Sequence, residues 1–148
     1  MSGAKVFVDT NVLLYSVDFR EPLKQKAAQD WLNTLWGLGS GSLSWQVLHE
    51  FYANANRKLE TPGETAREMV RVYAAWNPEG PSLAVLERAW HWRDHAHISF
   101  WDAMIVSSAE QASCQWLLSE DLQAERQFGA VTVINPFNRK PEEILRAP

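Results

Sequence analysis

Four acidic residues stand in short segments that place each of them at the edge of an apolar element. Asp9 follows the apolar run KVFV, Glu50 lies in SWQVLHEFYAN, Asp102 in SFWDAMIV and Asp121 in WLLSEDLQ. Carboxylates that face one another repel and raise each other's pKa values unless a cation is present. Because Mg²⁺ and Mn²⁺ prefer oxygen ligands, the four residues are candidate ligands for such an ion. A divalent ion held there would lower the pKa of a water ligand and stabilise charge on a phosphoryl oxygen, as phosphodiester hydrolysis requires.

Each acid also has an ordinary structural explanation. Asp9 and Asp121 precede expected helices, and Asp102 has capping-box spacing from Ser99. Glu50 falls in the second turn of an expected helix, where the alternative is a solvated flank. The two kinds of role are compatible, because a carboxylate at a helix start is held in place and the helix dipole favours its ionised form. The case for chemistry therefore depends on whether the fold brings the four together.

The elements that must position these acids alternate between short strands and helices. Strands are expected at 5–8, 115–118 and 131–134, with a weaker candidate at 42–44. Helices are expected from Thr10, Pro22, Ser44, Thr61, Ser82 and Ser99, and a short one at 122–128. This alternation predicts an α/β fold with a mainly parallel central sheet. Ligands of such sheets bind beyond the carboxyl ends of the strands, so Asp9 and Asp121 can face one crevice.

Other catalytic constellations are missing from the sequence. His91, His95 and His97 lie close together, but no HExxH pattern or cysteine pair accompanies them, which disfavours a zinc site. There is no GxSxG nucleophile motif, no Walker-type loop and no GxGxxG.

Length and composition predict one globular domain spanning residues 1–148, with a polar tail from about residue 135 that is loosely held. The single cysteine, Cys114, fits a reducing compartment. With neither a secretory leader nor a long apolar segment in the sequence, we expect a cytoplasmic protein without a membrane association. The formal net charge of −4 argues against nucleic-acid binding. Two divalent ions among the acids would cancel that charge, so the overall balance does not exclude RNA.

These segments together resemble the PIN-domain ribonucleases, and in particular the VapC-like toxins of bacterial toxin–antitoxin pairs. FVDTNVLLY resembles the segment of the family's first acid, and SWQVLHEFYANANRKL that of the second. HISFWDAMIVSSAEQASCQWLLSEDLQ, with SFWDA and SEDL, carries the third and fourth. The resemblance implies a three-layer α/β/α fold and Mg²⁺- or Mn²⁺-dependent endoribonuclease activity. It also implies a homodimer and a cognate antitoxin partner.

The resemblance also implies roles for individual residues. Asp9 and Asp102 would be the principal metal ligands, and Glu50 and Asp121 would complete the catalytic acids. The supporting polar residues would be Thr10, Asn11 and Ser119.

Basic residues near the expected site are candidates for contact with RNA phosphates. Arg57 and Lys58 end the helix that carries Glu50, and Arg139 and Lys140 lie in the tail. For all four, a solvated surface position is the alternative.

Two other functions stay open at this point. One is a catalytically silent PIN-like module that binds RNA or protein, although the complete acid set disfavours it. The other is a different metal-dependent phosphoryl hydrolase with Asp9 as nucleophile. The haloacid-dehalogenase kind would need a second Asp two residues later, where this chain has Asn11.

Overall fold

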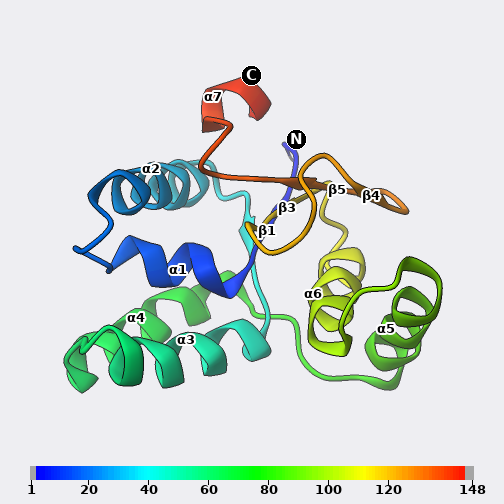
Figure 1. The fold of residues 1–148 in the computed structure, drawn as a ribbon, viewed down its shortest axis with the longest axis horizontal. Helices are drawn as coiled ribbons and strands as arrows, with labels where there is room; N and C mark the ends of the chain where they lie inside the picture. The colour runs from blue at the N-terminus through cyan, green and yellow to red at the C-terminus, as the bar shows by residue number, and fades with distance from the viewer. Residues whose placement is uncertain (1–2, 146–148) are drawn as a thin grey trace.

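A central sheet runs through the middle of the molecule (Figure 1). The computed structural model describes residues 3–145, and within them five strands pair in the order β2-β1-β3-β5-β4. β1, β2, β3 and β5 pair in parallel, whereas β4 and β5 pair antiparallel. The strand bounds are β1 (Val6–Val8), β2 (Gly41–Ser42), β3 (Trp116–Leu118), β4 (Gln127–Phe128) and β5 (Val131–Ile134). The predicted α/β class with a mainly parallel sheet is confirmed.

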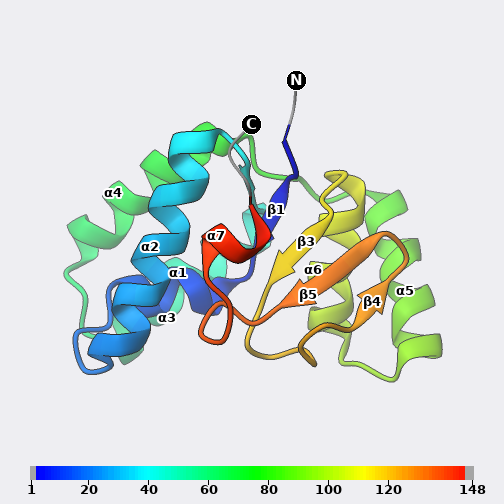
Figure 2. The same cartoon turned by 90° about the horizontal axis from the view of Figure 1, so that it is seen from above.

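Helices lie on both sides of this sheet. α6 contacts β3 and β5 from one face, and α5 packs beside α6 and reaches the β4 edge, where the Trp92 ring meets that of Phe128, whereas α7 lies over the opposite face (Figures 1 and 2). α1, α2, α3 and α4 gather beyond the β1 side of the sheet (Figure 2). The helix bounds are α1 (Thr10–Ser16), α2 (Pro22–Leu38), α3 (Trp45–Lys58), α4 (Gly63–Tyr73), α5 (Leu83–Ala96), α6 (Phe100–Gln111) and α7 (Pro141–Ile144), with a 3-10 turn at Ala74–Trp76.

Local sequence explains where most elements begin and end. Ser44 and Ser82 cap α3 and α5, since each hydroxyl accepts a hydrogen bond from the backbone N–H three residues later. Gly39 ends α2 in the left-handed region, with φ of 64°. Gly41 in β2 lies directly against the ring of Trp76, so a Cβ atom there has no room. The weak strand expected at 42–44 is shifted and shorter: β2 spans Gly41–Ser42, and Ser44 forms only an isolated bridge with Glu79.

Two expectations about helices are wrong. Residues 122–128 do not form a helix; Gln127 and Phe128 form β4 and pair with Thr132 and Val131. Gly129 has φ of 61° and begins the two-residue turn that joins β4 to β5. Thr61 does not cap α4, because the helix starts at Gly63 without a side-chain cap.

Residues 135–145 of the tail pack on the body of the protein, and the last residues of the expected loose tail lie outside the described residues. The indole Nε1 of Trp31 in α2 lies 3.2 Å from the carbonyl oxygen of Pro136 and 2.9 Å from that of Arg139. The ring of Phe137 meets that of Tyr15 edge to face, with centroids 5.0 Å apart. These contacts are between residues far apart in the sequence, which explains why local composition did not reveal them.

Across residues 3–145, no helix has the length and apolar character that a membrane crossing needs.

Candidate active site

Asp9 and Ser119 lie side by side because the strands before them are paired. Val8 of β1 is in register with Leu118 of β3, and the Asp9 N–H donates to the Leu118 carbonyl at 3.0 Å. The Ser119 hydroxyl donates to Oδ2 of Asp9 at 2.8 Å. Asp9 is only 5% exposed, so its carboxylate sits at the floor of the crevice beyond the carboxyl ends of the strands.

The carboxylate of Asp9 also caps the first helix. Its Oδ1 accepts a hydrogen bond from the N–H of Thr10 at 2.7 Å. Burial nevertheless raises the pKa of Asp9 from 3.8 to about 7, against the lowering effect of the hydrogen bonds from Ser119 and Thr10. The charges of Asp121 and Asp102 add to the increase. At neutral pH this carboxylate is therefore poised between its two protonation states until a cation stabilises its charge.

Glu50 reaches the same crevice from α3. Its Oε1 accepts a hydrogen bond from the Thr10 hydroxyl at 2.7 Å, and its Oε2 lies 3.4 Å from Nε2 of Gln46. The side chain is half-buried rather than fully solvated. Thr10, expected to support the first acid, thus connects the second acid to α1.

Helix α3 presents a whole polar stripe to the crevice. Gln46, Glu50, Asn54 and Lys58 follow one another at four-residue intervals and all line the same cavity. Sequence reasoning selected Glu50 and Lys58 but missed Gln46 and Asn54. The i, i+4 spacing, which puts residues on one helix face, was the signal that could have found them.

Asp102 approaches from the first turn of α6. The Ser99 hydroxyl accepts a hydrogen bond from the Asp102 N–H at 3.1 Å and so caps the helix. Burial raises the pKa of the Asp102 carboxyl; the hydrogen bond with Ser99 lowers it and the charge of Glu50 raises it further. Helix capping and an inward-facing carboxylate therefore coexist here.

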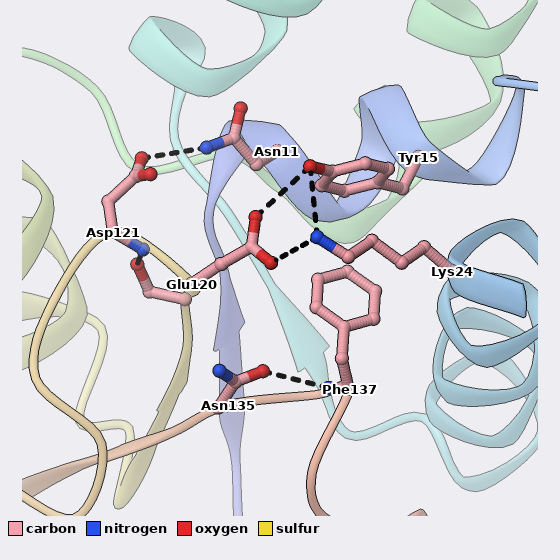
Figure 3. Close-up of polar contacts among 8 residues, drawn as sticks. Asn11, Tyr15, Lys24, Glu120, Asp121, Asn135 and Phe137 are labelled. Carbon is pink, nitrogen blue, oxygen red and sulfur yellow. Dashed lines mark hydrogen bonds and ion pairs between the residues drawn. The ribbon is translucent and has the colours of Figure 1, made fainter. Parts of the chain in front are cut away.

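Asp121 and its neighbour Glu120 point in different directions, as Figure 3 shows. Asp121 accepts a hydrogen bond from Nδ2 of Asn11 at 2.7 Å. Glu120 instead forms an ion pair with Lys24, with 2.6 Å between Nζ and Oε2, and accepts from the Tyr15 hydroxyl at 3.1 Å. The structure thus separates the two acids of SEDL, and Asp121 is the one that faces the crevice.

Asp121 does not have the helix-capping role that the sequence offered as its structural explanation. Residues 122–128 form no helix, so Asp121 caps nothing. Its own N–H donates to the Ser119 hydroxyl at 3.1 Å, which links it to Asp9 through one serine. Burial is the largest cause that raises the pKa of the Asp121 carboxyl, followed by the charges of Asp102 and Glu120.

One cavity of about 200 Å³ brings the four acids together. Thr10 and Asn11 line it as well, whereas Ser119 lies behind Asp9 and holds it. The residues that line the cavity are Asp9, Thr10, Asn11, Leu14, Gln46, Glu50, Asn54, Lys58, Trp101, Asp102, Ile105 and Asp121. Four segments far apart in the sequence thus supply four carboxylates to a space of a few water molecules.

The donor set fits a hard divalent cation, since the acids and amides around the cavity offer only oxygen ligands of the kind that Mg²⁺ and Mn²⁺ prefer. Among the described residues, no group of three or more His, Cys, Asp or Glu side chains is arranged so that it could hold a metal ion as it stands. Binding one ion would require the carboxylates to turn toward each other. Mg²⁺ needs few protein ligands, because waters and substrate phosphate complete its shell.

The chain belongs to the PIN domain family, whose model matches residues 6–127. Comparison with curated protein sequences gives no significant match. Two solved structures share the fold. VapC20 from Mycobacterium tuberculosis, described as a toxin that cleaves the sarcin–ricin loop, matches with a TM-score of 0.55 at 21% identity, over 79% of this chain and 90% of its own. A toxin–antitoxin complex from Klebsiella pneumoniae matches with a TM-score of 0.57 at 17% identity, over 89% of this chain and 98% of its own.

Proposed function

We propose that this protein is a Mg²⁺- or Mn²⁺-dependent endoribonuclease that hydrolyses RNA phosphodiester bonds. The observation that carries the proposal is the convergence of Asp9, Glu50, Asp102 and Asp121 on one cavity. Carboxylates that line one partly buried cavity are costly to keep charged without a cation, which a purely structural role would not require. Membership of the PIN domain family supports the same assignment.

Asp9 and Asp102 would hold the ion, with Glu50 and Asp121 as further ligands. When bound, the ion would supply Lewis-acid stabilisation of phosphoryl charge and lower the pKa of a water ligand. The chain's own residues orient the carboxylates. Ser119 donates to Asp9, while Thr10 and Asn11 of α1 donate to Glu50 and Asp121.

The decisive experiment compares RNA cleavage by the parent protein and by Asp102→Asn. We expect cleavage of total RNA in Mg²⁺ or Mn²⁺, none with excess chelator, and a loss of at least about 100-fold in the variant, because a metal-binding carboxylate contributes several kcal/mol. Asp30→Asn is the matched control. It makes the same chemical change at an exposed position on α2, where Asp30 pairs, among residues 3–145, with Lys26 alone at 3.3 Å.

Failure of this experiment would favour one of the alternatives. If folded parent protein, free of any bound partner, cleaves no RNA in either metal, the silent binding module becomes the better interpretation. Hydrolysis of a small phosphate ester without RNA cleavage would indicate the other phosphoryl hydrolase.

We further propose a toxin role with a cognate antitoxin partner, a homodimer and a cytoplasmic location. The names of the two structural neighbours support the toxin–antitoxin part of this proposal. Induced expression should arrest growth of a bacterial host, and Asp102→Asn should not. Arrest by both proteins would contradict a toxicity that depends on cleavage.

Lys58 is the basic residue best placed to contact substrate phosphate. It lines the acid cavity, whereas Arg57 donates to Asn54 at 3.0 Å on the exposed surface. Arg139 and Lys140 line a separate cavity of about 640 Å³ between α2 and the tail. Arg139 is also paired there with Glu125 and Glu143.

Replacing Lys58 with Gln is expected to weaken RNA binding evenly across sequences. It should also reduce the slope of log affinity against log salt by roughly 0.7, the contribution of one single-strand phosphate contact. Arg57→Gln removes the same charge one residue away and should reduce the salt slope less than the Lys58 variant does. Equal slopes in the parent and both variants would show that neither residue contacts phosphate.

A further inference from the structure

A second cavity adjoins the acid cavity and shares part of its wall. Its volume is about 360 Å³, and Gln46, Glu50 and Trp101 line both cavities. The remaining wall comes from Trp45 and His49 of α3, residues 79–81 before α5, Val85 of α5, and Met104 and Ser108 of α6. A ligand group in the acid cavity therefore has this space immediately beside it.

Two tryptophans of this second cavity are exposed. Trp101 is 60% and Trp45 38% accessible to solvent, although a large aromatic side chain is stabilised by burial. Trp101, which directly precedes Asp102, lines both the acid cavity and the second cavity. Aromatic faces in such positions are suited to stacking with nucleobases, which tolerates any base because every base has a π-face.

Gln46 adds a polar group to the wall between the cavities. Its Nε2 lies 3.4 Å from Oε2 of Glu50, and this contact fixes the orientation of the amide, since the reverse orientation would put two oxygens together. Its Oε1 is buried and has no hydrogen-bond partner among the described residues. A buried acceptor without a donor costs about 1–3 kcal/mol, which a ligand N–H that reached it would recover.

We propose that the second cavity is a nucleobase subsite. It would hold a base of the RNA strand next to the phosphate in the acid cavity, stacked on Trp101, with Trp45 as a further apolar wall and Gln46 Oε1 accepting a base N–H. This inference rests on the proposed function, because it takes RNA as the ligand of the acid cavity. The shared wall favours this occupant over a peptide or a second copy of the chain, since a base and its adjacent phosphate are covalently joined and the two cavities adjoin.

The test measures binding rather than turnover. All proteins carry Asp102→Asn and are studied in Mg²⁺, and the probe is a single-stranded oligoribonucleotide that contains 2-aminopurine, whose fluorescence is quenched by stacking. Adding Trp101→Ala should weaken binding by roughly 5- to 100-fold, which corresponds to the loss of one stacked base, and should restore the fluorescence of the bound probe. Trp101→Phe, which keeps an aromatic ring, should retain most of the affinity for the probe and most of the quenching.

Trp90→Ala is the matched control, because Trp90 is 48% exposed on α5 and lines neither cavity. Equal affinity and quenching in the Trp101→Ala and Trp90→Ala proteins would overturn the subsite. A change of molecular mass in solution caused by Trp101→Ala, with RNA binding per chain intact, would overturn it in favour of a contact between two copies. If Trp101→Ala weakens capture of a cognate antitoxin and leaves RNA binding intact, the second cavity binds a peptide and the subsite proposal is overturned.

The subsite and the nuclease can fail separately. If binding depends on Trp101 but the parent protein cleaves no RNA, the subsite proposal is supported and the nuclease proposal is contradicted. If the parent cleaves RNA but binding does not depend on Trp101, the nuclease proposal is supported and the subsite proposal is contradicted.

Discussion

Without metal, the parent protein should become less stable as the pH rises from 5 to 8, and Asp9→Asn should remove most of that loss. The pKa of Asp9 is raised by burial from 3.8 to about 7, so the folded state favours the protonated form. Stability from this group is complete below pH 3.8 and is lost as the pH rises through 7. The difference between these two pKa values corresponds to roughly 4 kcal/mol of unfolding free energy by pH 8, of which about 3 kcal/mol is lost between pH 5 and 8.

Thermal unfolding in excess chelator at a series of pH values measures this effect. In Asp9→Asn, the amide can still accept from the Thr10 N–H and donate to the Ser119 hydroxyl, so the cap should survive without the buried charge. The variant should therefore be more stable than the parent at pH 8 and nearly equal to it at pH 4. The carboxyls of Asp102 and Asp121, whose pKa values are also raised, leave a smaller residual slope.

Adding Mg²⁺ should stabilise the parent more at pH 8 than at pH 5, because a metal ion and a proton compete for the same carboxylates. In Asp9→Asn this gain should shrink. A metal-free parent whose stability is constant or increases between pH 5 and 8 would contradict the assigned role of the buried Asp9 charge.

Ser119→Ala is expected to lower activity at pH 7 by roughly 10- to 100-fold, the usual effect of removing a group that orients a metal ligand. Ser119 is fully buried, donates to Asp9 and accepts from the Asp121 N–H. Its hydrogen bond lowers the pKa of Asp9, so its removal should raise that pKa further. The acidic limb of the pH–activity profile should move to higher pH, and raising the pH should recover part of the activity.

Ser107→Ala is the matched control for this variant. Ser107 is also fully buried, and its hydroxyl donates to the Val85 carbonyl at 2.7 Å, away from the acid cavity. Both variants lose a buried hydroxyl, yet the pH profile should shift in Ser119→Ala alone. If the two profiles coincide, Ser119 contributes to stability but does not orient Asp9.

The positions of Asp9 and Asp121 could be predicted because parallel strands bring their carboxyl ends to one edge, whereas Glu50 and Asp102 lie on helices and were placed in the site only by the family resemblance. Asp9 and Ser119 each follow a short apolar strand, and their pairing needs no information beyond the topology. The contacts of Thr10 with Glu50 and of Asn11 with Asp121 were beyond such reasoning. They span 40 and 110 residues and depend on how α1 is rotated against α3 and the loop after β3.

Residues 122–128 show how a local signal can mislead. A glycine after a short apolar segment is typical of a helix end, but the same left-handed conformation also suits a hairpin turn. At Gly129 the hairpin prevails because it gives β5 an antiparallel neighbour, and Phe128 becomes buried in the core. That outcome depends on tertiary pairing, which no window of a few residues contains.

The family match ends at residue 127, but the strand that supports the fourth acid depends on residues beyond that point. β5 (Val131–Ile134) pairs along the whole of β3, whose end leads to Ser119 and Asp121. Phe137 then covers the Lys24 ammonium from 5.1 Å while Lys24 holds Glu120 (Figure 3). A chain shortened to the matched span would leave β3 as an open, apolar sheet edge, which is a template for pairing with other chains. Its first failure would therefore be aggregation, before any defect in chemistry could be observed.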